Sequence, residues 1–143
     1  MTKLNKLGAA LGALAQVTAL TDVTGFGLLG HLKEMCEGSN VCAEIDFKNI
    51  PVLPDLDFYI EKKSLPGGTV RNWKSYGDAI GEISDDQKAI LADPQTSGGL
   101  LIALDKSAVS AFEKMLIKNG LEKFITPIGR ILPPGKGKLI EVI

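Results

Sequence analysis

A glycine-rich turn that joins an apolar strand to an apolar helix constrains this fold more than any other feature of the chain. Residues 21–31 read Thr-Asp-Val-Thr-Gly-Phe-Gly-Leu-Leu-Gly-His. A strand is predicted at about 19–23, and a helix at about 26–37, because apolar residues recur there at helical spacing, namely Leu28, Leu29, Leu32 and Met35. A strand that passes directly into a helix is typical of layered α/β and α+β domains.

The rest of the chain continues this mixture. Apolar periodicity and capping residues predict further helices at about 4–16, 55–63, 84–92 and 107–119. Further strands are predicted at about 41–47, 99–104, 125–132 and 138–143. The apolar run at 99–104 predicts a central strand, and the prolines and glycines of 133–137 predict a hairpin between the last two strands. We therefore expect one domain over residues 1–143, an α/β (α+β) unit with a layered mixed sheet packed with helices.

Length and charge exclude several classes of partner. The 143 residues are enough to bury a core, and a hydrophobic content of 45% is ordinary for a globular protein. The 16 basic and 17 acidic residues leave a net charge of −1, so a basic face that holds nucleic acid is not expected. The same balance gives no polybasic membrane patch. We expect small-molecule substrates, no nucleic acid and no membrane.

The N-terminal segment allows two interpretations. Lys3 and Lys6 precede an apolar run at 7–15, which resembles a signal peptide. The alternative is an amphipathic first helix, because four leucines fall on one face, namely Leu4, Leu7, Leu11 and Leu14. The run is shorter than the roughly 20 apolar residues that span a bilayer. We favour the amphipathic helix and a cytoplasmic protein.

The two cysteines, Cys36 and Cys42, form neither a metal-binding nor a disulfide pattern. They make no C-x-x-C pair, and no second pair exists that could complete a zinc site. We expect two small buried hydrophobic side chains in a reducing compartment. Cys36 falls within a predicted helix among apolar neighbours, where a thiolate is disfavoured, so it is not expected to be a nucleophile.

Asp22 stands at the end of the predicted strand, beside the start of the predicted helix. A carboxylate there suits Mg²⁺, which takes one or two carboxylates together with substrate phosphates. The hydroxyl groups of Thr21 and Thr24 and the amides of 25–27 could complete an anion-facing turn. The alternative is that Asp22 or Thr24 only caps the helix, and the residues by themselves favour that alternative. His31, the only histidine, is expected to be packed or capped rather than catalytic.

The glycines of residues 25–30 also match the G-x-G-x-x-G fingerprint of dinucleotide-binding folds. Glu44 and Asp46 lie near the position of a ribose-binding acid. Against this interpretation, the Asp22 carboxylate would repel a bare pyrophosphate, and the prolines and hairpins that follow do not predict a second βαβ unit. A free-standing nucleotide-binding module stays open as an alternative.

Two further segments have the small and polar residues of ligand-facing loops. Residues 93–99 read Asp-Pro-Gln-Thr-Ser-Gly-Gly and predict a tight turn into a strand. Residues 66–69 read Pro-Gly-Gly-Thr, with Asn72 shortly after, and predict a turn or a lid that faces a ligand.

The three segments 21–32, 66–72 and 93–100 resemble, in order and spacing, the C-terminal half of the selenophosphate synthetases (selenide, water dikinases) of the aminoimidazole ribonucleotide synthetase superfamily. The resemblance covers the whole chain. It implies a phosphotransferase that converts ATP, selenide and water to selenophosphate, AMP and phosphate. It also implies a homodimer whose N-terminal domain, absent from this chain, dimerises and carries most of the ATP site.

The resemblance implies roles for individual residues. Asp22 matches an aspartate that helps to ligate Mg²⁺. Other residues are expected near the substrate or nucleotide, namely Thr21, Thr24, Gly25, Gly27, Gly67, Gly68, Thr69, Asn72, Asp93, Thr96 and Ser97. The reactive cysteine or selenocysteine, its neighbouring lysine and the other metal-binding aspartates belong to the N-terminal domain of the family. The chain is therefore expected to fold alone, to hold no catalytic residue and to be inactive alone. The alternatives are a related synthetase or kinase of the superfamily and a purely structural domain.

Overall fold

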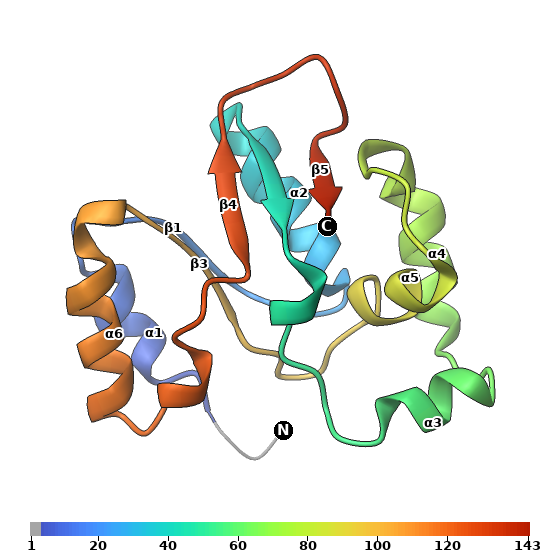
Figure 1. Cartoon of the computed structure of the whole chain (residues 1–143), viewed down its shortest axis with the longest axis horizontal. Helices are drawn as coiled ribbons and strands as arrows, with labels where there is room; N and C mark the ends of the chain where they lie inside the picture. The colour runs from blue at the N-terminus through green and yellow to red at the C-terminus, as the bar shows by residue number, and fades with distance from the viewer. Residues whose placement is uncertain (1–3) are drawn as a thin grey trace.

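A computed structural model describes residues 4–143, and Lys3 of the signal-like segment lies outside the described residues. Two small β-sheets and six α-helices make up this part of the chain (Figure 1). The helices are α1 (Leu7–Gly12), α2 (Gly27–Ser39), α3 (Leu56–Glu61), α4 (Gly67–Tyr76), α5 (Asp85–Leu91) and α6 (Val109–Lys118). Short 3-10 helices lie between them, namely η1 (Phe47–Asn49), η2 (Gly77–Ala79), η3 (Lys106–Ala108) and η4 (Glu122–Phe124). This mixture confirms the predicted fold class.

The strands form two separate sheets. The first is a two-stranded antiparallel ribbon of β1 (Val17–Asp22) and β3 (Leu100–Leu104). The second has the order β4-β2-β5, with β4 (Gly129–Leu132), β2 (Cys42–Ile45) and β5 (Ile140–Val142). Because β2 runs antiparallel to β4 and parallel to β5, the second sheet is mixed, as predicted.

The predicted hairpin between the last two strands is wrong. β4 and β5 lie on opposite sides of β2, and the 133–137 loop crosses over between them (Figure 1). Packing explains the crossing, because Ile140 of β5 is fully buried and also forms a parallel bridge to Ile80. A local turn signal cannot report that a third strand lies between two consecutive ones.

The sequence predicts that the apolar strand β3 is a central strand, but the structure shows that it is not. It pairs only with β1 among the described strands, and Leu101 is its one buried residue. Two of its other apolar side chains lie near helices: Leu100 lies against Gly8 of α1, and Leu104 lines a small cavity with Phe112 of α6. The continuous apolar pattern therefore reflects contacts with helices rather than neighbouring strands on both sides.

The first helix is shorter than predicted. α1 has only six residues, and of the leucine stripe Leu11 is fully buried while Leu4 is 71% exposed. Gly8 and Gly12 lie at either end of this segment, and glycine favours a helix poorly. The chain then enters β1 at Val17.

The segment that begins Pro66-Gly67-Gly68 forms the start of α4 rather than a turn or a lid, so that prediction is wrong. Pro66 precedes the helix with φ −61° and ψ 140°, a conformation that its ring favours. Gly68 is needed for packing, because a Cβ on it would lie 2.6 Å from Cγ of Pro94. Because of the glycine pair, this helix of ten residues is not predicted from the sequence.

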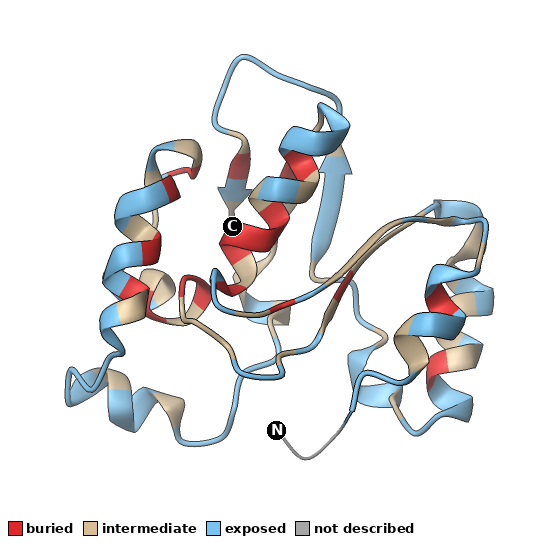
Figure 2. Ribbon diagram, turned by 180° about the vertical axis from the view of Figure 1, so that it is seen from behind, coloured by how far each residue is buried: buried red, intermediate tan, exposed pale blue. Residues whose placement is uncertain are grey.

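The core lies between α2 and the second sheet. Buried residues lie along α2 (Figure 2), and they meet buried residues of the sheet in one cluster that includes Leu29, Leu32, Cys36, Ala43, Ile45 and Ile140. Full burial of one large aliphatic side chain contributes about 1.5–3 kcal/mol to stability. This layer therefore anchors α2, and with it the turn at the N-terminal end of α2.

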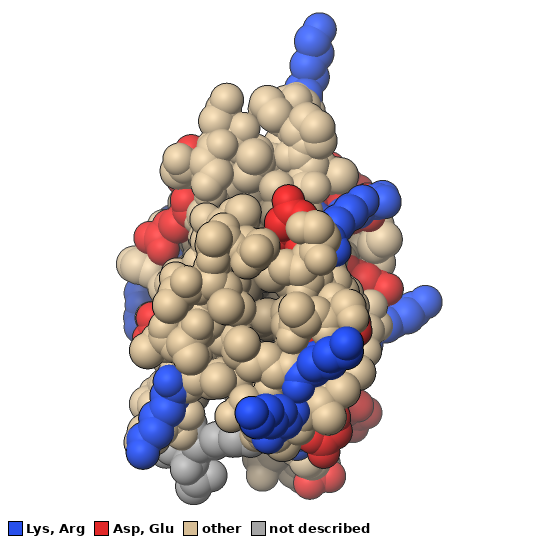
Figure 3. Space-filling view, turned by 90° about the vertical axis from the view of Figure 1, so that its left-hand side faces the viewer, with Lys and Arg blue, Asp and Glu red and all other residues tan. Residues whose placement is uncertain are grey.

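Charged side chains are scattered on the face that carries α6 and β4, around an uncharged central area (Figure 3). Three large apolar residues of α6, η4 and β4 are exposed, namely Ile117, Phe124 and Ile131. No helix within residues 4–143 is both long enough and apolar enough to cross a bilayer.

Candidate functional site

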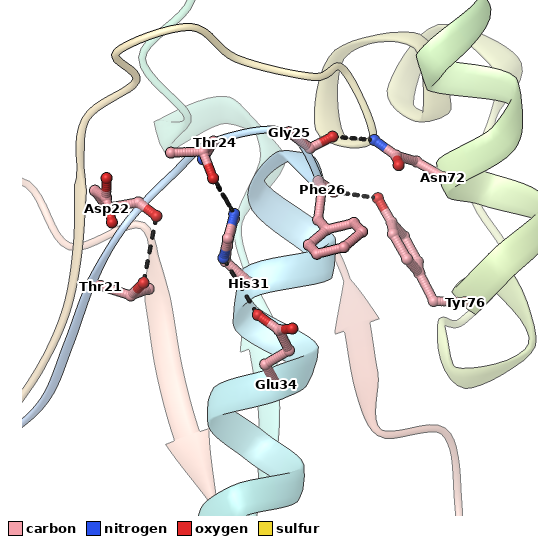
Figure 4. A network of polar contacts seen from close by, with 9 residues as sticks. All are labelled: Thr21, Asp22, Thr24, Gly25, Phe26, His31, Glu34, Asn72 and Tyr76. Atoms are coloured by element: carbon pink, nitrogen blue, oxygen red, sulfur yellow. Dashed lines mark hydrogen bonds and ion pairs between the residues drawn. The ribbon is translucent and has the colours of Figure 1, made fainter.

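The three predicted segments meet at the turn between β1 and α2 (Figure 4). β1 ends at Asp22, and Gly27 begins α2 with a left-handed φ of +71°. The Gly27 amide donates to the Thr24 carbonyl oxygen at 2.9 Å, which closes the turn. A Cβ on Gly27 would lie 2.8 Å from the carbonyl carbon of Ala92, so the turn packs directly against the backbone that leads to Asp93.

Helix α4 holds the turn through two side chains. The Asn72 side-chain amide donates to the carbonyl oxygens of Gly25 at 2.8 Å and Ala92 at 2.9 Å. One helical turn later, the Tyr76 hydroxyl donates to the Phe26 carbonyl oxygen at 2.7 Å. Burial is the main cause that raises the pKa of Tyr76 to about 12, so its hydroxyl stays a donor at neutral pH. The carbonyl groups of Gly25 and Phe26 therefore both accept a hydrogen bond from a side chain of α4.

The Asp22 carboxylate and two backbone amides of the turn make no hydrogen bond within residues 4–143. The Asp22 carboxylate is exposed and has no hydrogen-bond or ion-pair partner in the described part of the chain, since the Thr21 hydroxyl donates to the Asp22 backbone oxygen instead. The amides of Gly25 and Phe26 have no acceptor among residues 4–143. One free carboxylate thus lies close in sequence to two free amides, which suits a metal bound to an anion.

The capping alternative is wrong. α2 begins after Phe26 with no side-chain hydrogen bond at its N-terminus, so neither Asp22 nor Thr24 caps it. The Thr24 side chain contacts the imidazole of His31 instead. His31 itself is buried and packed, as predicted.

Asp93 joins α4 to the loop that follows α5. Its Oδ1 accepts from the Thr69 hydroxyl at 3.2 Å, and its Oδ2 accepts from the Gln95 side-chain amide at 2.7 Å. The Gln95 backbone amide donates to the Thr24 carbonyl oxygen at 3.0 Å, so the loop is tied to the turn as well. Both carboxylate oxygens of Asp93 are occupied, and its visible role is to hold the segments together.

Asp93 is expected to make stability depend on pH. Burial raises the pKa of its carboxyl group, while the hydrogen bonds from Thr69 and Gln95 oppose that shift. The folded chain then binds this proton more readily than the unfolded chain, so the contribution of Asp93 to the free energy of unfolding falls as pH rises through the raised pKa. In urea unfolding, the difference between wild type and Asp93→Asn should favour the wild type more at about pH 4 than at about pH 7. A difference that grows toward pH 7 would contradict this.

The loop after α5 also runs beside the end of β1. The Val23 amide donates to the Gly99 carbonyl oxygen at 2.9 Å. A Cβ on Gly98 would collide with the Val23 carbonyl oxygen, so this close approach requires glycine. The two hydroxyl-bearing residues of the bend are exposed, namely Thr96 and Ser97.

The residues of the described chain do not complete a metal site. No group of three or more His, Cys, Asp or Glu side chains suited to a metal occurs in residues 4–143. Asp22 therefore offers one oxygen-bearing side chain, and Mg²⁺ there would need its other oxygen ligands from phosphate groups, from water or from residues beyond this stretch. That donor set fits Mg²⁺, which usually keeps several waters and few carboxylates.

The dinucleotide interpretation does not fit the topology. β1 pairs antiparallel with β3, and β2 lies in the other sheet, so α2 does not connect two parallel strands of one sheet. The two candidate ribose-binding acids are also engaged elsewhere. Glu44 is ion-paired with Arg130 at 2.8 Å, and Asp46 accepts from the Lys48 amide at 3.0 Å.

Sequence analysis missed Tyr76 and Gln95 as parts of this site. Tyr76 follows Asn72 by four residues and shares its helix face, but that signal is readable only once α4 is recognised as a helix. Gln95 lies within a predicted segment, yet nothing in its type distinguishes it from a solvated loop residue. Of the predicted residues, Gly67 is exposed at the first position of α4 and Gly68 serves packing.

Cys36 is expected to resist thiol reagents in the folded chain. It is fully buried, and burial, helped by the neighbouring Cys42 and Glu37, raises its pKa to about 11. Because the thiolate is the reactive form, we expect Ellman's reagent at about pH 8 to modify the less buried Cys42 at least about 10-fold faster than Cys36. In denaturant both thiols should react. Equal rates in the folded chain would contradict the burial of Cys36.

The fold and the site define a layered α+β domain that presents one strand-end carboxylate beside the start of a helix. The family model described as AIR synthase related protein, C-terminal domain, matches residues 1–141, and the chain belongs to this family.

Curated relatives of the chain are named selenide, water dikinase. The protein from Aeromonas salmonicida is 46% identical over 143 residues, which cover 100% of this chain and 41% of that protein. The protein from Pasteurella multocida is 51% identical over 131 residues, which cover 92% of this chain and 37% of that protein. The protein from Photorhabdus laumondii is 48% identical over 143 residues, with coverage of 99% and 41%. The chain therefore spans about two fifths of the length of these relatives.

Proposed function

We propose that the chain is the C-terminal domain of an ATP- and Mg²⁺-dependent selenide, water dikinase, which converts ATP, selenide and water to selenophosphate, AMP and phosphate. The identity of 46–51% to relatives with that name supports the reaction. The observation that carries the proposal is the position of Asp22. Its carboxylate, which has no partner among residues 4–143, lies at the turn where the three segments of the resemblance come together.

Asp22 is the residue through which this domain reaches the metal. When bound, Mg²⁺ neutralises phosphate charge and holds the attacking and leaving oxygens in line. The chain would hold one side of this arrangement, because the Asp22 carboxylate would ligate the metal. The free amides of Gly25 and Phe26, beside the positive end of the α2 dipole, donate to a phosphate oxygen.

The remaining machinery lies outside the chain. The domain pairs with an N-terminal domain that carries most of the ATP site, the reactive cysteine or selenocysteine, its lysine and the other metal-binding aspartates. That domain also forms the homodimer, and the enzyme acts in the cytoplasm. The burial of Cys36, which raises its pKa to about 11, supports this division, because that thiol is not suited to the reaction.

The test is selenide-dependent AMP formation by the full-length protein. With ATP and Mg²⁺ present, we expect AMP to form when selenide is added and only slowly without it. Omission of Mg²⁺ should stop the reaction. ATP consumption that is indifferent to selenide, or that yields ADP with another acceptor, would assign the chain to a related synthetase or kinase of the superfamily instead.

A further inference from the structure

We propose that His31 is a positioning residue, which holds the Asp22–Gly27 turn in its working conformation by accepting a hydrogen bond from the Thr24 backbone. This inference rests on the proposed function, in which Asp22 ligates the metal. His31 does not reach the reacting groups in this account. It acts on them through Thr24.

The contacts of the imidazole are specific. Its Nε2 lies 3.0 Å from the Thr24 backbone nitrogen and 3.1 Å from the Thr24 hydroxyl oxygen (Figure 4). Its Nδ1 lies 3.3 Å from Oε2 of Glu34, one helical turn later in α2. The Phe26 ring lies beside it, with 6.0 Å between the ring centroids, and the whole residue is only 8% exposed. The ring is thus held on both of its nitrogens.

These contacts select one tautomer. A backbone N–H can only donate, so Nε2 must present its lone pair to the Thr24 amide. The ring proton then lies on Nδ1, the nitrogen that faces the Glu34 carboxylate at 3.3 Å. This contact favours the tautomer in which Nε2 accepts, and His31 becomes a fixed acceptor at the base of the turn.

Thr24 is the residue through which this acceptor controls the site. Its amide is bound to His31, and its carbonyl oxygen accepts from the amides of both Gly27 and Gln95. Its two peptide planes are therefore fixed, and they lie between Asp22 and the free amides of the turn. Loss of the His31 contact would release the plane nearest Asp22 while α4 still held the Gly25 and Phe26 carbonyls. The Asp22 carboxylate and the two amides would then no longer be held in a fixed arrangement. This is the loss of preorganisation that follows when a supporting contact is weakened.

The first test reads the tautomer in the full-length wild-type protein and does not depend on enzyme activity. With ¹⁵N-labelled histidine, the signal of His31 is identified by its absence from the spectrum of His31→Gln. We expect a lone-pair-bearing Nε2 and a protonated Nδ1 at neutral pH. A protonated Nε2 would overturn the proposal, because the ring could not then accept from Thr24.

The second test uses two variants of His31 in the full-length protein. His31→Gln can place a carbonyl oxygen near the position of Nε2, whereas His31→Leu removes the acceptor. We expect His31→Leu to raise the Mg²⁺ concentration for half-maximal AMP formation at least about 10-fold, as loss of a supporting contact to a metal ligand does, and we expect His31→Gln to recover most of that loss. Equal Mg²⁺ dependence in the wild type and both variants would overturn the proposal, as would equal impairment in both. If His31→Leu does not fold, the tautomer and His31→Gln still decide it.

Failure of this inference can be told apart from failure of the proposed function. If Asp22→Asn abolishes the reaction while His31→Leu leaves its Mg²⁺ dependence unchanged, only the role of His31 is lost. If the full-length protein shows no selenide-dependent reaction at all, the proposed function is lost, and the tautomer measurement still reports whether His31 holds Thr24.

Discussion

Replacement of Asp22 by asparagine in the full-length protein is expected to slow selenide-dependent AMP formation at least about 100-fold. A metal ion supplies several kcal/mol of transition-state stabilisation to phosphoryl transfer, and each 1.4 kcal/mol or so corresponds to a factor of ten in rate. Asparagine keeps the size of the side chain but removes the charge that holds Mg²⁺. Steady-state measurement of AMP at saturating ATP and selenide, over a range of Mg²⁺ concentrations, gives the comparison.

The same substitution should leave the fold unchanged, because the Asp22 carboxylate is exposed and makes no hydrogen bond or ion pair with another described residue. We expect its free energy of unfolding to stay within about 0.5 kcal/mol of wild type, as for most surface substitutions. Asp57→Asn is a matched control, since Asp57 is another exposed aspartate, on α3. Near-normal turnover in Asp22→Asn, or an equal loss in Asp57→Asn, would remove the metal role from Asp22.

Gly27→Ala is expected to cost about 2–5 kcal/mol of stability. Gly27 has φ +71°, a conformation that costs a non-glycine residue about 1–3 kcal/mol. Its new Cβ would also lie 2.8 Å from the Ala92 carbonyl carbon and 2.9 Å from the Asp93 carbonyl oxygen, and backbone atoms cannot move aside cheaply. Urea unfolding of the chain measures the loss directly.

Gly25→Ala provides the control for this prediction. Gly25 lies two residues earlier in the same turn, but a Cβ there would meet no atom within 4 Å. We expect Gly25→Ala to change the free energy of unfolding by less than about 1 kcal/mol. If Gly27→Ala were as stable as Gly25→Ala, the close packing of the turn against the Ala92–Asp93 backbone would be wrong.

The parts of the fold that are coded locally could be predicted from the sequence. α2 has a regular apolar stripe and ends at Ser39, close to the predicted end at about residue 37, where Asn40 adopts a left-handed φ of 51°. α5 begins after Ser84, where its helix is predicted to start, with a capping box in which Ser84 accepts from the Gln87 amide at 3.1 Å and the Gln87 side chain accepts from the Ser84 amide at 2.8 Å. Caps and periodicity act within a few residues, so a single sequence reports them well.

The parts that depend on distant contacts could not be predicted. α4 begins with two glycines, which are poor helix formers. The close packing of Gly68 against Pro94, a distant contact, explains one of the two. The partner of β3 and the position of β5 beside β2 are also settled by packing between remote segments. The resemblance pointed to Thr24, Asn72 and Asp93, which meet around the turn, but not to Tyr76 or Gln95. It could not say that Asn72 binds the turn, or that Asp93 is a clamp with occupied oxygens.

The measurement that tests the central claim most directly is ³¹P NMR of ATP, Mg²⁺ and selenide with the 143-residue chain alone and, in parallel, with the full-length protein. If the chain is one half of an active site, selenophosphate should appear only with the full-length protein, and ATP should remain intact with the folded chain alone. Formation of selenophosphate by the chain alone, at a rate near that of the full-length protein, would contradict this account.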